Sequence, residues 1–332
     1  MKDNNMNIQS SKYILLTGAG FTKNFGTPLA SEMWAEIFNH KKVQAQSNIK
    51  ELMKNHCDYE SIYYSIMEGS YTDNEKEAIN NAVKSAYGYI DKILMEPVSL
   101  SPYPEELHNV NDLIYRFGET SNKSFIFTLN QDLFFERLYN HPKLSIPGIK
   151  NNSEWFTTRF KDPLRPEDYY RLPDENKLNH NESEILSDGD FFLLKLHGSY
   201  NWISFDGTQK MVIGRGKTDQ IQKEPLLKYY FTVFKKVLSQ NQSRLLIIGY
   251  GFGDDHINRI ISESVRDNGL KIYIISPVSP KELKGILEKK DFGKDIWQGI
   301  SGYFPYSLNE IFSENFFKYQ AIKQHFYDVF FE

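Results

Sequence analysis

The sequence contains a single cysteine, Cys57, among 332 residues. It can therefore form neither a disulfide within the chain nor a zinc site built from cysteines. Its 39 basic and 43 acidic residues leave a net charge of only −4, so no basic surface indicates nucleic-acid binding. No apolar run approaches the roughly 18 residues of a membrane-spanning helix, and the first residues are too polar for a signal peptide. We expect a cytoplasmic protein that binds neither membranes nor nucleic acid directly.

The chain does contain five strand-like runs, most of them continuously apolar. They cover residues 13–16, 124–128, 191–196, 244–248 and 271–275. Continuous apolar strands are typical of parallel sheets buried on both faces, whereas alternating patterns indicate one solvated face. The sequence therefore predicts an α/β fold whose mostly parallel sheet is covered by helices on both faces.

The segments between these runs predict a single domain over 1–332 with additions. Apolar residues at spacings of three and four, such as Ile79, Val83 and Ile90, predict a helical insertion over 30–120. Residues 141–190 are polar and indicate a long connection or small subdomain. An aromatic-rich helical segment is expected over 303–332, which docks on the sheet or forms an oligomer or partner interface.

Glycine-rich turns follow two of the runs. The first contains Gly18, Ala19, Gly20, Phe21 and Thr22, and the second contains Gly249, Tyr250, Gly251, Phe252 and Gly253. In open parallel sheets, ligands bind beyond the carboxyl ends of the strands. Glycine turns there let backbone N–H groups approach a pyrophosphate. The first turn lacks the third glycine of a dinucleotide fingerprint, because Lys23 stands there, so a plain tight turn is the alternative. Asp254 or Asp255 is expected to cap the next helix.

Polar residues follow two further runs, the second and the third. Asn130 and Asp132 end the second run, and they are either helix caps or site residues. His197 and Gly198 end the third run, where the histidine is structural unless a ligand approaches across the glycine. The sequence at 214–218 ends like a P-loop, but Met211 replaces a required glycine, so we expect a turn with a solvated Lys217.

Taken together and in order, these four motifs resemble the sirtuin superfamily. They are most similar to the zinc-free, sirtuin-like NADase domains of bacterial anti-phage defence, and the resemblance covers about residues 12–280. It implies a Rossmann-like fold that binds NAD+ without a metal. By matching position, Asn130 would orient the ribose and a water molecule, Asp132 would hold the nicotinamide carboxamide, and His197 would take up a proton. The remaining matched positions would contact the dinucleotide: Gly18, Ala19, Gly20, Phe21, Thr22, Gly198, Gly249, Tyr250, Gly251, Phe252 and Asp254.

The sequence departs from the deacylating sirtuins in two places. Their structural zinc needs four cysteines, and the Pro-Asp-Phe-Arg stretch after their glycine turn is replaced here by residues 25–29. Both differences favour water as the acceptor, which gives NAD+ hydrolysis to nicotinamide and ADP-ribose.

The resemblance predicts an abortive-infection effector that depletes NAD+. Its activity would be controlled by homo-oligomerisation or by a partner, such as a HerA-type ATPase. The alternatives are a non-catalytic NAD+ or ADP-ribose-binding subunit of a defence complex and a zinc-free deacylase or ADP-ribosyltransferase. A redox dehydrogenase is disfavoured because no acidic residue ends a second Rossmann strand about 20 residues after the first turn.

Overall fold

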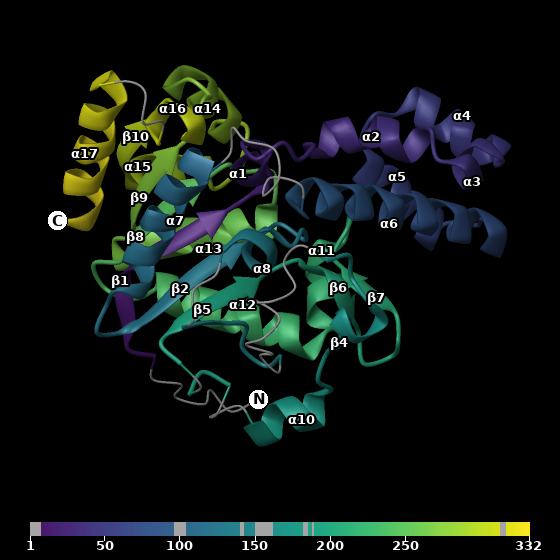
Figure 1. The fold of residues 1–332 in the computed structure, drawn as a ribbon, viewed down its shortest axis with the longest axis horizontal. Helices are drawn as coiled ribbons and strands as arrows, with labels where there is room; N and C mark the ends of the chain where they lie inside the picture. The colour runs from purple at the N-terminus through teal and green to yellow at the C-terminus, as the bar shows by residue number, and fades with distance from the viewer. Residues whose placement is uncertain are drawn as a thin grey trace.

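A computed structural model describes residues 8–95, 104–139, 143–149, 162–181, 185–187, 189–312 and 317–332. Its main sheet contains β1 (Ser10–Thr17), β2 (Lys123–Thr128), β3 (Leu144–Ser145), β5 (Phe191–Lys195), β8 (Arg244–Ile248), β9 (Lys271–Ile275) and β10 (Ile300–Phe304). The strand order is β10-β9-β8-β1-β2-β5-β3 (Figure 1), and the pairings described within it are parallel. The predicted parallel α/β sheet is confirmed, and all five predicted strands are present. The sequence did not predict β3 or β10.

The strand order places a switch point between β1 and β8. From β1 the chain reaches β2 and β5 on one side, and it then returns to β8 on the other. The carboxyl ends of the strands are level, because one row of paired residues contains Thr17, Thr128, Lys195, Ile248, Ile275 and Phe304. Residues that directly follow these strands therefore meet at one edge of the sheet, where such folds bind their ligands.

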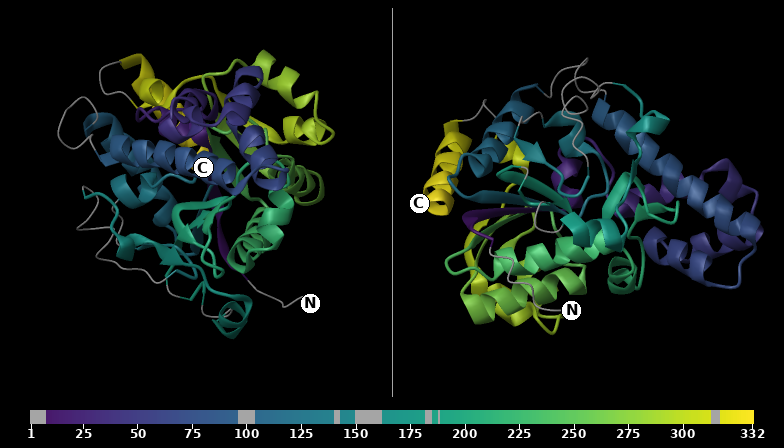
Figure 2. Two further views of the ribbon diagram at one scale, coloured as in Figure 1. Left: turned by 90° about the vertical axis from the view of Figure 1, so that its right-hand side faces the viewer. Right: turned by 90° about the horizontal axis from the view of Figure 1, so that it is seen from below.

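Helices cover both faces of this sheet, as expected (Figure 2). The helices α12 (Pro225–Leu238), α13 (Asp255–Asn268) and α15 (Gly293–Gly299) pack in series on one face. On the other face lie α7 (Pro104–Gly118) and α17 (Phe317–Phe331). The Phe330 ring of α17 contacts the rings of Tyr13, Phe117 and Tyr273. The aromatic C-terminal helix thus packs against its own sheet.

A helical arm extends from the body between β1 and α7 (Figure 1). It consists of α2 (Ala30–Phe38), α3 (Lys41–Gln44), α4 (Ser47–Asn55), α5 (Tyr59–Glu68) and α6 (Asp73–Met95). The long helix α6 buries Ile79, Val83 and Ile90 at helical spacing, as the sequence predicted. The segment 30–120 therefore contains this arm together with α7, which packs on β1 and β2.

A second sheet has the order β4-β6-β7 and flanks the carboxyl end of β5. It contains β4 (Tyr170–Arg171), β6 (Gly198–Ile203) and β7 (Gln209–Met211). The other helices of the described residues are α1 (Ala19–Lys23), α8 (Phe134–Leu138), η2 (Pro166–Asp168), α10 (Glu175–Asn181), α11 (Lys217–Gln222), α14 (Pro280–Leu287) and α16 (Leu308–Ile311). Parts of three predicted segments lie outside the described residues: 96–103 of the insertion, 141–142, 150–161, 182–184 and 188 of the connection, and 313–316 of the C-terminal segment. Over the described ranges, no helix is long and apolar enough to cross a membrane.

Candidate functional site

A cavity of about 890 Å³ opens at the level carboxyl ends of the strands. Its volume lies within the range of roughly 300–1,000 Å³ that is typical of small-molecule and cofactor sites. The sequence-predicted residues that line it are Gly18, Ala19, Gly20, Thr22, Asn130, Asp132, His197, Gly249, Tyr250, Gly251, Phe252 and Asp254. The fold thus brings together residues separated by more than 200 positions in the sequence.

Two of the predicted residues do not line this cavity. Phe21 is fully buried, and its ring packs against Phe25 and Phe134. Gly198 has a φ of +76°, and a Cβ atom there would lie 2.4 Å from the carbonyl oxygen of Lys210. Phe21 therefore anchors α1 in the core, while Gly198 lets the chain turn into β6 directly after the site histidine.

The two glycine turns interlock through their backbones. Gly249 has a φ of +69°, and a Cβ atom there would lie 2.0 Å from the backbone nitrogen of Phe21. A Cβ atom on Gly18 would lie 2.7 Å from the carbonyl oxygen of Gly249. The first turn after β1 and the turn after β8 can therefore approach this closely only because side chains are absent at both positions.

The interlocking uses several backbone donors of the first turn. The N–H groups of Gly18, Gly20 and Phe21 donate to the carbonyl oxygens of Ile248, Gly249 and Gly18, at 3.0, 2.9 and 2.8 Å. Three of the five N–H groups in this turn thus have protein acceptors. These three N–H groups are therefore engaged within the protein.

Asn130 is held by the first glycine turn rather than by a helix. Its Nδ2 group donates to the carbonyl oxygen of Gly18 at 3.1 Å and to Oγ1 of Thr22 at 3.2 Å. Its backbone N–H donates to Oγ1 of Thr128. The capping alternative does not describe this residue, whose amide is oriented by groups on the neighbouring strand end.

Asp132 lies at the start of α8, where its Oδ1 accepts a hydrogen bond from the N–H of Phe134 at 3.0 Å. Its side chain therefore accepts from the first N–H of the helix, although Leu133 holds the N-cap position. Burial raises the pKa of its carboxyl group to about 6, although the nearby Lys195 opposes this rise. The carboxyl group thus titrates just below neutral pH.

A buried ion pair fixes the turn that carries Asp132. Nζ of Lys195 donates to the Asp132 carbonyl oxygen at 2.5 Å and to Oε1 of Glu136 at 2.7 Å. The side chains of Lys195 and Glu136 are 1% and 2% exposed. In the sequence, Lys195 looked like the polar end of a strand, and no local pattern indicated its role.

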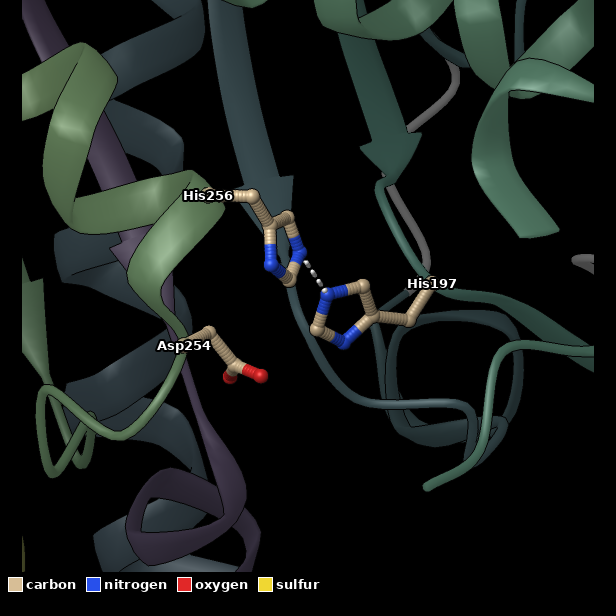
Figure 3. Close-up of side chains that lie close together, drawn as sticks. All are labelled: His197, Asp254 and His256. Carbon is tan, nitrogen blue, oxygen red and sulfur yellow. Dashed lines mark hydrogen bonds between the residues drawn. The ribbon is translucent and has the colours of Figure 1, made fainter. Parts of the chain in front are cut away.

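His197 faces a second histidine that the sequence did not indicate as a site residue (Figure 3). The Nε2 atoms of His197 and His256 are 2.9 Å apart, so one ring donates and the other accepts. Burial lowers the pKa of His197 to about 3, and it lowers the pKa of His256 too. Both rings are therefore neutral at pH 7.

Lys217 corrects another sequence prediction, because it is not a solvated turn residue. Its side chain is 16% exposed, and Nζ lies 2.9 Å from carboxylate oxygens of both Glu60 and Asp254. Burial opposes the charged lysine, but the two carboxylates outweigh it and hold the lysine pKa above its usual value. Asp254 stands at the N-cap position of α13 without a side-chain capping bond, and its carboxylate is turned toward Lys217 instead.

The helical arm contributes directly to the cavity wall through residues such as Tyr59, Glu60 and Tyr87. The hydroxyl of Tyr87 donates to Oε1 of Gln131, and Nε2 of Gln131 donates to the carbonyl oxygen of Val212 at 2.7 Å. The arm is therefore connected to the segment between Asn130 and Asp132. Glu60 connects it to the opposite rim through Lys217.

Three side chains form a group that could hold a metal ion, and two of them, His197 and Asp254, line the cavity. One ligand atom each of His197, Asp254 and His256 lies within 4.8 Å of the others. The sequence predicted no metal, because it has only one cysteine and no His-Glu-x-x-His pattern. This group combines residues from two different strand ends.

The parallel sheet of this chain and the cavity at its switch point are those of a Rossmann-like α/β protein. Its candidate site lies at the strand ends. The chain belongs to the SIR2-like domain family, whose model matches residues 124–293, more than half of its length. The match includes Asn130, Asp132, His197 and Asp254, whereas the first glycine turn and the helical arm precede it.

One of the solved structures that match this chain has low similarity to it. It is a Sir2 homologue with a histidine-to-asparagine substitution, solved in complex with ADP-ribose. The two chains are 12% identical with a TM-score of 0.44, and the alignment covers 95% of this chain and 94% of the other. A search of curated proteins finds no match.

Proposed function

We propose that this protein is an NAD+ glycohydrolase that releases nicotinamide and ADP-ribose. The observation that carries the proposal is the convergence of Asn130, Asp132 and His197 on one cavity beside two interlocked glycine turns. Membership of the SIR2-like family supports a dinucleotide as the ligand. The cavity volume also suits a ligand of this class.

The reaction breaks the bond between nicotinamide and ribose C1′. The bonding pair leaves with the nicotinamide nitrogen, an oxygen of water bonds to C1′, and one proton is released. Asn130, which is oriented by Gly18 and Thr22, positions the ribose and the water. Asp132 holds the leaving carboxamide. The neutral His197 takes up the proton, and fixed polar groups in a largely buried site stabilise the oxocarbenium-like transition state.

The biological role that we propose is depletion of cellular NAD+ during phage infection, in the cytoplasm. Such an activity is toxic to its own cell and must be held off until infection. Control by homo-oligomerisation or by a HerA-type ATPase is proposed on the resemblance to defence proteins. The arm residues Glu60 and Tyr87 support it, because both reach the cavity and could transmit a partner's binding.

Nicotinamide release from NAD+, measured with the protein alone and in its assembled state, tests the activity. Asn130→Ala and His197→Ala should each lower kcat by about 10²–10⁴-fold. His325→Ala is the matched control, since His325 is exposed on α17. Turnover that persists at the wild-type rate in both site variants would overturn the assigned mechanism.

One observation favours a second candidate, a non-catalytic subunit that binds NAD+ or ADP-ribose. His256 occupies Nε2 of His197, the atom that must accept a proton during hydrolysis. A permanent pairing would leave binding without catalysis. This candidate predicts saturable ADP-ribose binding by calorimetry with no nicotinamide release in any assembled state.

A further inference from the structure

The two facing histidines and the carboxylate beside them include side chains that the proposed hydrolysis does not use. That reaction needs only His197, whereas His256 and Asp254 have no part in bond cleavage. All three project toward one small space from the strand end after β5 and the start of α13 (Figure 3). Nitrogen and carboxylate oxygen ligands of this kind suit Zn²⁺ and its neighbours among the divalent transition metals.

His197 is already oriented as a metal ligand. Its Nε2 atom lies 2.9 Å from Nε2 of His256, so this nitrogen points into the space between the two rings. One of the two rings donates the proton of this hydrogen bond, and that proton occupies the position that a metal ion would take.

The spacing of the two rings is close to what a metal requires. Metal–nitrogen bonds of about 2.0–2.1 Å in a tetrahedral site hold the two nitrogens about 3.3 Å apart. The observed Nε2–Nε2 distance is 2.9 Å, so the rings need to separate by only a few tenths of an ångström. The ring of Phe231 contacts His256, with centroids 5.6 Å apart, and limits how far this ring can turn away.

The charges around the group also favour a cation. Asp254 and Glu60 are both paired with a single cation, Lys217. With neutral histidines, these three side chains carry a net charge of −1. A divalent ion would therefore enter a site with an unbalanced negative charge rather than one already neutralised by the lysine.

We propose that Nε2 of His197, Nε2 of His256 and one carboxylate oxygen of Asp254 bind a divalent transition metal ion of the Zn²⁺ class. The ion replaces the hydrogen bond between the rings, and the Nε2 proton of the donating ring moves to Nδ1 of that ring or to solvent. A fourth position remains for water. Mg²⁺ and Ca²⁺, which prefer oxygen ligands, are not bound at this site.

Occupancy of this site inhibits the protein, a consequence that rests on the proposed function. The metal uses the Nε2 lone pair of His197, which then cannot accept a proton during NAD+ hydrolysis. The same three side chains therefore have a metal-free, reactive state and a metal-bound, blocked state.

Zn²⁺ binding to the full, untagged chain tests the site without reference to activity. All variants carry Cys57→Ser, because this exposed thiol would also bind zinc. Competition with a chromophoric chelator should show one Zn²⁺ per chain, and Co²⁺ should give the visible absorption band of a low-coordinate site. His256→Ala should weaken the affinity by at least roughly 100-fold, because loss of a direct ligand costs no less than loss of an outer-shell partner.

Two further variants keep the test decisive. His256→Asn preserves much of the ring's volume if the alanine variant fails to fold, and it should weaken binding similarly. His325→Ala removes an exposed histidine and should leave binding unchanged. If the folded His256 variants bind Zn²⁺ as tightly as His325→Ala does, or if wild type binds no Zn²⁺, the proposed site is wrong.

An activity measurement separates this inference from the proposed function. Zn²⁺ should inhibit nicotinamide release at the concentrations that fill the site, whereas Mg²⁺ should not. Zn²⁺ binding without any NAD+ turnover would leave the metal site standing and count against the hydrolase. Turnover that is insensitive to bound Zn²⁺ would overturn the inhibitory role.

Discussion

The strand ends at the base of the cavity fall into two pairs, which are held together by different kinds of contact. At the ends of β1 and β8, backbone packs directly on backbone, and Gly18, Gly20 and Gly249 leave no space for side chains. At the ends of β2 and β5, the contacts are made by buried polar side chains, namely Asn130, Asp132, Glu136, Lys195 and His197. Added side-chain atoms should therefore disturb the ends of β1 and β8 most, and changed charges should disturb the ends of β2 and β5 most.

This difference separates two kinds of constraint on one site. Steric constraints at the glycine turns act at single positions and do not depend on pH. Electrostatic constraints at β2 and β5 depend on partners that lie far apart in the sequence, and they change with protonation. Four substitutions, ordered from the largest expected effect to the smallest, test whether the two pairs of strand ends differ as described.

Gly249→Ala should have the largest effect. The added Cβ atom would lie 2.0 Å from a backbone nitrogen at a φ of +69°, so we expect a loss of more than about 4 kcal/mol in the free energy of unfolding. Gly251→Ala is the matched control, because a Cβ atom there has nothing within 4 Å. Chemical denaturation of both variants measures the difference, and equal stabilities would show that the turns do not interlock.

Lys195→Met should follow. It leaves the buried Glu136 carboxylate without its cation, at a cost of about 3–5 kcal/mol. Adding Glu136→Leu should recover much of this loss. Lys42→Met breaks an exposed lysine–glutamate pair of the same 2.7 Å length and should leave stability almost unchanged. If Lys42→Met and Lys195→Met cost the same in denaturant unfolding, burial is not what gives the Lys195 pair its importance.

Asp132→Asn should change the pH dependence of stability. Burial raises the folded-state pKa of this carboxyl from 3.8 to about 6. The stability associated with its protonated form is therefore fully present below about pH 4 and is lost as the pH rises through 6. We expect the wild type to lose on the order of 1–3 kcal/mol across this window. The asparagine variant should lack this loss, and parallel denaturation profiles from pH 4.5 to 7 would refute it.

Tyr87→Phe should have the smallest effect. It removes the buried hydrogen bond to Gln131 and the longer one, of 3.5 Å, between the hydroxyls of Tyr87 and Tyr59. We expect a cost of about 0.5–1.5 kcal/mol, because Gln131 keeps its bond to Val212. Tyr89→Phe is the control, since Tyr89 is 49% exposed on the same helix. A thermal melt that shifts equally in both variants would mean that the hydroxyl of Tyr87 does not hold the arm.

The sequence predicted the parts of the fold that follow from local patterns. Continuous apolar runs identified five strands, and spacings of three and four identified α6. Because parallel strands share one carboxyl edge, their terminal residues, such as Asn130 and His197, could be expected to converge. The strand β10 was missed because Ser301 and Gly302 interrupt its apolar pattern.

The contacts that were missed are the ones between distant segments. Lys217 looked solvated because its partners, Glu60 and Asp254, come from the arm and from the start of α13. His256 was taken as part of a helix start, since only the folded chain brings it to His197. The backbone donors used by the glycine turns likewise depend on two turns meeting, which neither turn reveals alone.

The level ends of the strands also determine the distance between the two ends of the site. Four interstrand spacings of about 4.8 Å separate β9 from β5, so the residues that follow these two strands lie roughly 19 Å apart across the base of the cavity. Ser276 lies at one end of this span and His197 at the other. A compact ligand can reach only one of them. The distance across the strand ends therefore favours an elongated ligand, which can contact both ends at once.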